Sequence, residues 1–220
     1  MEQLLAQRLA GELRIDVTQV VREYWEVVFL KGLLESGHGN GLVFKGGTAL
    51  RLVYGSPRFS EDLDFSLLED TLKGNLETLA NDITAPFPQA EITDVAEKRW
   101  TYLCEIKITE GYLSHPFRVK LEVSRRTVGG YQHKLRLITS PTIPLQVLAR
   151  VATLEQLYQD KLACVEERTA PKDIFDIWFI CGKLKIPYHP PETSVSPKIL
   201  KRDLGKYLPT DYRTVIEELL

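Results

Sequence analysis

The sequence is poor in the residues that build disulfide frameworks and soft-metal sites. Its three cysteines, Cys104, Cys164 and Cys181, are scattered, odd in number and without Cys-x-x-Cys spacing. The four histidines form no pair at metal-ligand spacing either. These absences argue against a disulfide scaffold and a zinc site, and predict that the cysteines are reduced core residues of a cytosolic protein.

The chain also lacks long apolar runs and an excess of positive charge. No hydrophobic stretch approaches the length of a membrane span and no signal peptide is expected, so we expect a cytoplasmic protein without membrane contact. The net charge of -2 and a pI of about 6.1 give no global basic field, although a local patch would suffice to bind RNA. A hydrophobic content of 44% and a charged content of 26% are ordinary for a globular protein.

The most informative stretch is KGGTALRLVYGSPRFSEDLDFSL, from Lys45 to Leu67. Its last part alternates polar and apolar residues, and successive side chains of a strand point to opposite faces, so Asp62 and Asp64 are predicted to lie side by side. Two neighbouring carboxylates repel each other unless a cation lies between them. A divalent metal with oxygen ligands, Mg²⁺ or Mn²⁺, is the expected cation. Taken alone, a D-x-D pattern more often marks a solvated strand face.

Two glycines, Gly46 and Gly47, precede a helical pattern in this stretch. Without a Cβ atom the backbone can approach a phosphate closely, and Thr48 is predicted to cap the helix that follows. A helix N-terminus presents free N–H groups and a partial positive charge to an anion. The motif is not a P-loop, because G-x-x-x-x-G-K-S/T is absent. A phosphate cradle followed by a carboxylate pair predicts chemistry on a nucleoside triphosphate.

The segments KGGTALR and RFSEDLDF, separated by a short spacer, resemble the AbiEii/AbiGii toxin family, a branch of the nucleotidyltransferase-like superfamily that includes the MenT toxins. A later segment, DKLACVEERTAPKDIFDIW, resembles the second signature of this family. The resemblance covers residues 45–67 and 154–178. It implies a metal-dependent nucleotidyltransferase that uses an NTP, acting as the toxin of a toxin–antitoxin or abortive-infection system. Some relatives transfer nucleotides to the 3′ end of tRNA, typically beside a gene for a DNA-binding, AbiEi-like antitoxin.

The resemblance and the charge pattern together assign the candidate site residues. The nucleotide would be bound by Lys45, Gly46, Gly47, Thr48, Arg51, Arg58 and Ser60. The metal would be held by Asp62, Asp64 and Glu122. The catalytic set would be Asp62, Asp64, Lys161, Asp173 and Asp176.

Glu122 is assigned because the superfamily places a third carboxylate on a later strand with a hydrophobic-acid-hydrophobic pattern. If the predicted strand 116–124 alternates cleanly, its apolar residues face the core and Glu122 faces the side on which it would meet Asp62 and Asp64. The alternative is an ordinary glutamate on a half-exposed strand. Glu105 is a second candidate for the third carboxylate.

Lys161 lies near the apolar stripe of a helix predicted to run from Thr153 to about Glu167. Its ammonium would neutralise triphosphate charge, although a lysine in this position often only reaches past the apolar face to water. Asp173 and Asp176 are three residues apart and therefore share a helix face. Their alternative roles are a helix-dipole acid and an ion pair with Lys161 or with the nearby Arg168.

Residues 125–140 contain the local cluster of positive charge, with Arg125, Arg126, Lys134 and Arg136. This segment is predicted to be a mobile loop that contacts the phosphates of a polynucleotide acceptor such as tRNA. A solvated surface loop is the alternative.

The predicted fold class is α+β. Residues 1–143 would form a nucleotidyltransferase-like half, a mixed β-sheet flanked by helices, and residues 144–220 a mainly helical half packed against it. Helices are expected at 2–10, 16–36, 71–85, 153–167, 171–182, 196–206 and 211–220, and further strands at 90–96, 99–109 and 116–124. Two other functions remain open: a transferase with a small-molecule or protein acceptor, and a non-catalytic nucleotide-binding regulatory partner.

Overall fold

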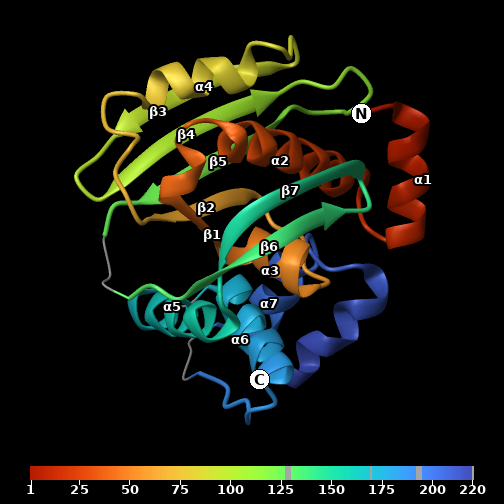
Figure 1. Ribbon diagram of the computed structural model, residues 1–220. Coiled ribbons are helices and arrows are strands. Elements are labelled where there is room, and N and C mark those ends of the chain that lie inside the picture. Colours follow the sequence, from red (N-terminus) through yellow and green to blue (C-terminus); the bar gives the residue numbers. More distant parts are fainter. Residues whose placement is uncertain (127–129, 169, 192–194, 220) are drawn as a thin grey trace.

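The structure is a computed structural model that describes residues 1–126, 130–168, 170–191 and 195–219. In this part of the chain, seven strands form one mixed sheet in the order β3-β4-β5-β2-β1-β7-β6 (Figure 1). The strands are β1 (Leu42–Lys45), β2 (Asp62–Leu67), β3 (Ala90–Glu97), β4 (Thr101–Ile108), β5 (Phe117–Ser124), β6 (His133–Ser140) and β7 (Ile143–Ala152). β2 pairs with β5 and β1 with β7 in parallel, and the other pairs are antiparallel.

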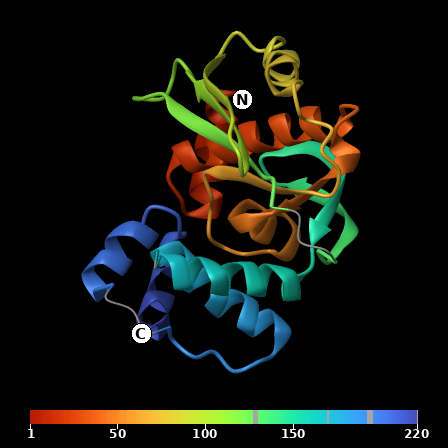
Figure 2. The same cartoon turned by 90° about the vertical axis from the view of Figure 1, so that its left-hand side faces the viewer.

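The two faces of the sheet are covered by different helices. The helices are α1 (Gln3–Leu13), α2 (Val17–Glu35), α3 (Gly46–Tyr54), α4 (Leu76–Thr84), α5 (Leu154–Glu167), α6 (Pro171–Leu184) and α7 (Pro197–Leu204), with 3-10 helices η1 (Gly39–Gly41) and η2 (Thr210–Leu219). The largest apolar cluster joins α2 and α4 to the sheet, and includes Trp25, Phe29, Phe44 and Phe65. A second cluster joins α3 to α5, α6, α7 and η2. The C-terminal helices therefore pack on the side of the sheet opposite α2 (Figure 2).

Local signals explain several helix boundaries. The Asp16 side chain accepts a hydrogen bond from the backbone N–H of Thr18 at 2.8 Å and caps α2. Thr153 caps α5 by accepting from the backbone N–H of Gln156. Pro171 occupies the first turn of α6, where its missing N–H costs nothing. The α+β class with a mixed sheet is confirmed, and strands β3, β4 and β5 match the predicted ranges within two residues.

Three predicted segments differ from the structure. Residues 133–140 form edge strand β6 instead of a loop, because they pair in register with β7. Residues 143–152 form β7, so the helical part begins at Leu154 and not directly after Pro144. The helix predicted at 71–85 begins only at Leu76. In β6 the charged Lys134 and Arg136 and the intervening Leu135 and Leu137 are all exposed, so no buried face distinguishes this strand from a loop. Residues 127–129 of the predicted loop lie outside the described residues.

Candidate active site

A cleft of about 380 Å³ opens between the start of α3, the faces of β2 and β5, and helices α5 and α6. It gathers charged side chains of both signs around the glycine pair. Its lining comprises Lys45, Gly46, Gly47, Arg58, Ser60, Asp62, Asp64, Phe65, Lys120, Glu122, Ser124, Leu157, Asp160, Lys161, Cys164, Arg168, Lys172 and Asp173. The volume lies in the range of small-molecule binding sites.

The glycine pair is required by close packing at the start of α3. Gly46 has φ of +77°, which side chains rarely adopt, and a Cβ atom there would lie 2.2 Å from Asp64 Oδ2. A Cβ atom on Gly47 would lie 2.2 Å from Arg58 Nη2. Gly46 and Gly47, at the start of α3, both line the cleft, and the Arg58 guanidinium packs against Gly47.

The predicted cap of α3 is corrected by the structure. The N-cap position is Lys45, and Thr48 lies inside the helix, where it is 1% exposed. The Thr48 hydroxyl donates a hydrogen bond to the carbonyl oxygen of Asp62 at 2.5 Å. Thr48 thus ties α3 to β2 and orients the strand that carries the carboxylates. It does not face the cleft.

Strand register brings the predicted acidic residues together. β2 and β5 are parallel, with Asp62 opposite Lys120 and Asp64 opposite Glu122. Apolar residues of β5 are buried while Lys120 and Glu122 point to the cleft, as the alternation predicts. Lys120 Nζ lies 2.5 Å from Glu122 Oε2, and Lys172 Nζ lies 3.7 Å from Asp62 Oδ2.

Among the acids that line the cleft, Asp64 is the one with a raised pKa. Burial, followed by repulsion from Asp62, raises its pKa from 3.8 to about 6. Attraction to Lys161 and Lys45 opposes this rise without cancelling it. Burial and repulsion both disfavour the ionised Asp64 carboxylate. An additional cation beside Asp64 would therefore be favourable.

Beneath the cleft lies a buried network of two cations and two aspartates. Arg58 donates two hydrogen bonds to Asp176, from Nε and Nη2, each 2.8 Å long. Lys161 Nζ lies 2.7 Å from both Asp173 Oδ1 and Asp176 Oδ2. Asp173 and Asp176 are 0% exposed, and the two cations lower the pKa of Asp176 against the effect of burial. The network fixes α5 and α6 against the segment between α3 and β2.

The comparison with protein-family models settles the family. Residues 28–216 match the model described as "Nucleotidyl transferase AbiEii toxin, Type IV TA system", and so the match spans both the sheet and the C-terminal helices. The chain belongs to the AbiEii family. By family it is a nucleotidyltransferase toxin of a type IV toxin–antitoxin system, with an antitoxin as its partner.

Solved structures share the fold of this AbiEii chain. MenT4, a nucleotidyltransferase toxin of Mycobacterium tuberculosis H37Rv, matches with a TM-score of 0.64 and 15% identity over 100% of this chain and 88% of its own. JHP933 from Helicobacter pylori matches with a TM-score of 0.59 and 21% identity over 93% of this chain and 90% of its own. The comparison with curated proteins gives no significant match.

No helix in the described part of the chain has the length and apolar character needed to cross a membrane.

Most of the predicted nucleotide-binding residues of this AbiEii chain line the cleft, but Thr48 and Arg51 do not. Its guanidinium pairs with Glu23, donates to the carbonyls of Ser56 and Pro57 at 3.1 and 3.3 Å, and stacks 3.5 Å from the ring centre of Phe59. Arg51 therefore stabilises the turn after α3, and the prediction that it binds the nucleotide is corrected. Arg51 lies in the last turn of α3, whereas the glycine pair lies at the start of this helix.

Asp176 is also placed differently from the prediction. It lies under the cleft, is absent from its lining, and holds Arg58 and Lys161 in the buried network. Its position supports the alternative of a structural ion pair. Lys161 and Asp173 do reach the cleft, although the Lys161 ammonium is already shared by two carboxylates.

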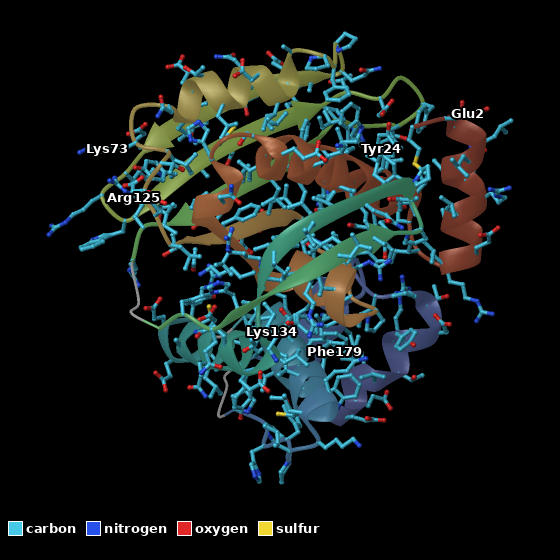
Figure 3. The ribbon with its side chains drawn as sticks, in the orientation of Figure 1. Glu2, Tyr24, Lys73, Arg125, Lys134 and Phe179 are labelled. Carbon is cyan, nitrogen blue, oxygen red and sulfur yellow. The ribbon has the colours of Figure 1, made fainter. Side chains whose placement is uncertain are left out.

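The four basic residues predicted to bind the acceptor do not form one patch. Arg125 and Arg126 follow β5, whereas Lys134 and Arg136 lie on β6, four places away in the sheet order. At the usual strand spacing this separation is roughly 19 Å. Figure 3 shows Arg125 near one end of the outer strands and Lys134 on β6. Arg125 pairs with Asp70 at 3.4 Å and Arg126 with Glu167 at 3.8 Å, so part of their charge is already neutralised.

Sequence reasoning missed several cleft residues. Arg168 lines the cleft from the end of α5, Lys172 from the first turn of α6, and Lys120 from β5. Tyr131 donates a hydrogen bond to Asp160, which also lines the cleft. The available signal for Lys172 was its position directly before the assigned Asp173 in the PKD segment.

The residues at the cleft fit a hard divalent cation at the aspartate pair. Asp62 and Asp64 share one strand face and line the cleft, and burial followed by repulsion from Asp62 raises the pKa of Asp64. Among the described residues, no three acidic, histidine or cysteine side chains are grouped as a ready metal cage. Glu122 is turned to Lys120, so its role as third ligand stays a prediction.

Proposed function

We propose that this chain is a Mg²⁺- or Mn²⁺-dependent toxin that transfers a nucleoside monophosphate from an NTP to the 3′ end of tRNA. One observation carries the proposal: a single cleft is lined by the glycine pair at the start of α3, by the Asp62–Asp64 carboxylate pair and by several cations. A triphosphate is an anion that needs all three features. Family membership supports nucleotidyl transfer, while the donor, the metal and the tRNA acceptor are proposed.

Each group of cleft residues would have a separate role in binding the triphosphate. The first N–H groups of α3, at Gly46 and Gly47, would donate to phosphate oxygens, and the Ser60 hydroxyl would add a donor. Lys45 and Lys172 would attract the triphosphate charge. When bound, the divalent cation held by Asp62 and Asp64 supplies charge neutralisation and lowers the pKa of the attacking hydroxyl.

Lys161 would act at the base of this arrangement. Lys161 lines the cleft and its ammonium is fixed by Asp173 and Asp176, so we propose that it presents positive charge to a phosphate without moving. Such pre-positioned charge stabilises a transition state because no reorganisation is needed during the reaction. Catalysis then rests on positioning and electrostatics, without a covalent enzyme intermediate.

The biological setting follows from the family and from the substrates. We place the protein in the cytoplasm, where NTPs and tRNA are found, which also suits the free cysteines. A DNA-binding, AbiEi-like protein is the proposed antitoxin. Inspection of the neighbouring gene tests this partner.

The decisive experiment is an incubation of the protein with each labelled NTP, Mg²⁺ and total tRNA. Transfer of label to tRNA, lost in EDTA and in Asp64→Ala, is expected. Exposed Asp94→Asn on β3 is the control substitution and should retain activity. Label on a small acceptor or a protein in place of tRNA would favour the transferase alternatives. Binding of NTP without any transfer would favour a non-catalytic regulatory partner.

A further inference from the structure

The turn between β3 and β4 exposes an aromatic side chain between positive charges. Residues Lys98, Arg99 and Trp100 connect the two strands and are all exposed, with Trp100 50% exposed. By contrast, Trp25 is 2% exposed in the main core. The exposed ring of Trp100 offers a large, flat apolar face on which a ligand could stack.

The turn is held in place by Arg125, directly after β5. The backbone N–H of Arg125 donates to the carbonyl of Trp100 at 2.9 Å, and its Nη1 donates to the carbonyl of Lys98 at 2.8 Å. The Arg125 guanidinium also lies 4.4 Å from the ring centre of Tyr102. Trp100 is therefore presented from a fixed backbone, which lowers the entropy cost of binding to it.

This fixed turn lies beside one end of the cleft. Thr101, which follows Trp100, is directly opposite Ser124 in the β4–β5 register, and Ser124 lines the cleft. Figure 3 shows Arg125 at this end of the outer strands. Trp100 is thus adjacent in the chain to the residue that pairs with Ser124 at the edge of the cleft.

The charges around Trp100 suit a polyanion. The Arg99 guanidinium carbon lies 4.8 Å from the ring centre of Trp100, and Lys98 is exposed beside it. Arg125 and Arg126, in contrast, pair with Asp70 and Glu167. An exposed aromatic ring with neighbouring exposed cations is the arrangement that binds single-stranded nucleic acid by base stacking and phosphate contacts.

We propose that Trp100 stacks an unpaired base of the RNA acceptor, with Lys98 and Arg99 contacting its backbone, while the 3′ end lies in the cleft. This inference rests on the proposed function in one respect, that the acceptor is RNA. The stacking contact would make the protein prefer RNA with a single-stranded 3′ end, since a base paired in a duplex offers no free face to Trp100. The acceptor surface is then centred on residues 98–100, and β6 lies outside it.

Tryptophan fluorescence tests the contact without requiring transfer. The wild-type protein is titrated with a hairpin RNA that carries a short 3′ overhang, and with the same hairpin made blunt. The overhang should quench the emission, and the quench should vanish in Trp100→Phe, which keeps Trp25 and Trp178 as internal references. An equal quench by the blunt hairpin, or one that persists in Trp100→Phe, would overturn the proposal.

Affinity measurements provide the second arm. Trp100→Ala should weaken binding of the overhang RNA by about 5- to 150-fold, the range for loss of one stacked base. Trp100→Phe should retain most of the affinity, and Arg99→Gln should reduce the salt dependence of binding. Tyr212→Ala, which removes an aromatic ring 43% exposed on η2, is the matched control and should bind as wild type.

The outcomes separate this inference from the proposed function. Nucleotide transfer to tRNA with undiminished RNA affinity in Trp100→Ala would overturn the stacking contact and leave the function standing. Overhang-specific quenching without any transfer would support the contact and reject the function. Circular dichroism of each variant confirms that the exposed substitution has left the fold intact.

Discussion

Asp64→Asn should stabilise the protein when no metal is present, and do so more at high pH than at low pH. In the wild type, burial and the neighbouring Asp62 raise the pKa of Asp64 from 3.8 to about 6. The folded chain therefore holds this proton more tightly than the unfolded chain. Between these two pKa values the native state binds more protons, so the Asp64 contribution to the free energy of unfolding falls as pH rises.

The size of the effect follows from the pKa change. A rise from 3.8 to about 6 corresponds to roughly 3 kcal/mol above pH 6, and access of water from the cleft reduces this to about 1–3 kcal/mol. For a chain of this length, 1 kcal/mol shifts Tm by roughly 2–4 °C. Asp64→Asn in EDTA is thus expected to melt several degrees above wild type near pH 8, and much closer to it near pH 4.

Thermal and urea unfolding in EDTA at several pH values measure this difference. Mg²⁺ should then reverse the order, because a ligand that binds the native state stabilises it and Asp64→Asn lacks one ligand. Exposed Asp94→Asn is the control and should change stability by less than about 0.5 kcal/mol at every pH. If Asp64→Asn were less stable than wild type near pH 8, or if the difference did not depend on pH, the reasoning about the Asp62–Asp64 pair would be refuted.

Three further substitutions test other parts of the site. Gly46→Ala should abolish nucleotidyl transfer in the tRNA assay, because its Cβ would displace Asp64 and its φ is unfavourable; full activity would contradict the close packing. Asp176→Ala should lower the free energy of unfolding by about 3–5 kcal/mol, since it leaves Arg58 buried without its partner, and a urea titration that shows no loss would reject the structural assignment. Arg51→Met should lower stability in the same titration while NTP affinity measured by calorimetry stays unchanged; a large loss of affinity would return Arg51 to the nucleotide site.

Much of the site was predictable because its signals are local. The alternation of Asp62 and Asp64 with apolar residues requires a strand with both acids on one face. The glycine pair and the following apolar pattern predict a helix start that opens to an anion. β6 was predicted as a loop because of its positive charges. Its residues 134–137 do alternate between charged residues and leucine, but all four are exposed, so the alternation marks no buried face.

The sequence by itself determined the local elements: the carboxylate strand, the glycine-started helix α3, the Thr153 cap and the Pro171 start of α6. Only the tertiary structure decided which distant groups meet. The parallel pairing of β2 with β5 places Glu122 opposite Asp64, and packing of α6 joins Asp176 to Arg58 across 118 residues. Such contacts depend on how distant segments of the chain pack together. The residue pattern determines which face of a helix or strand a side chain occupies, but not which side chain it meets there.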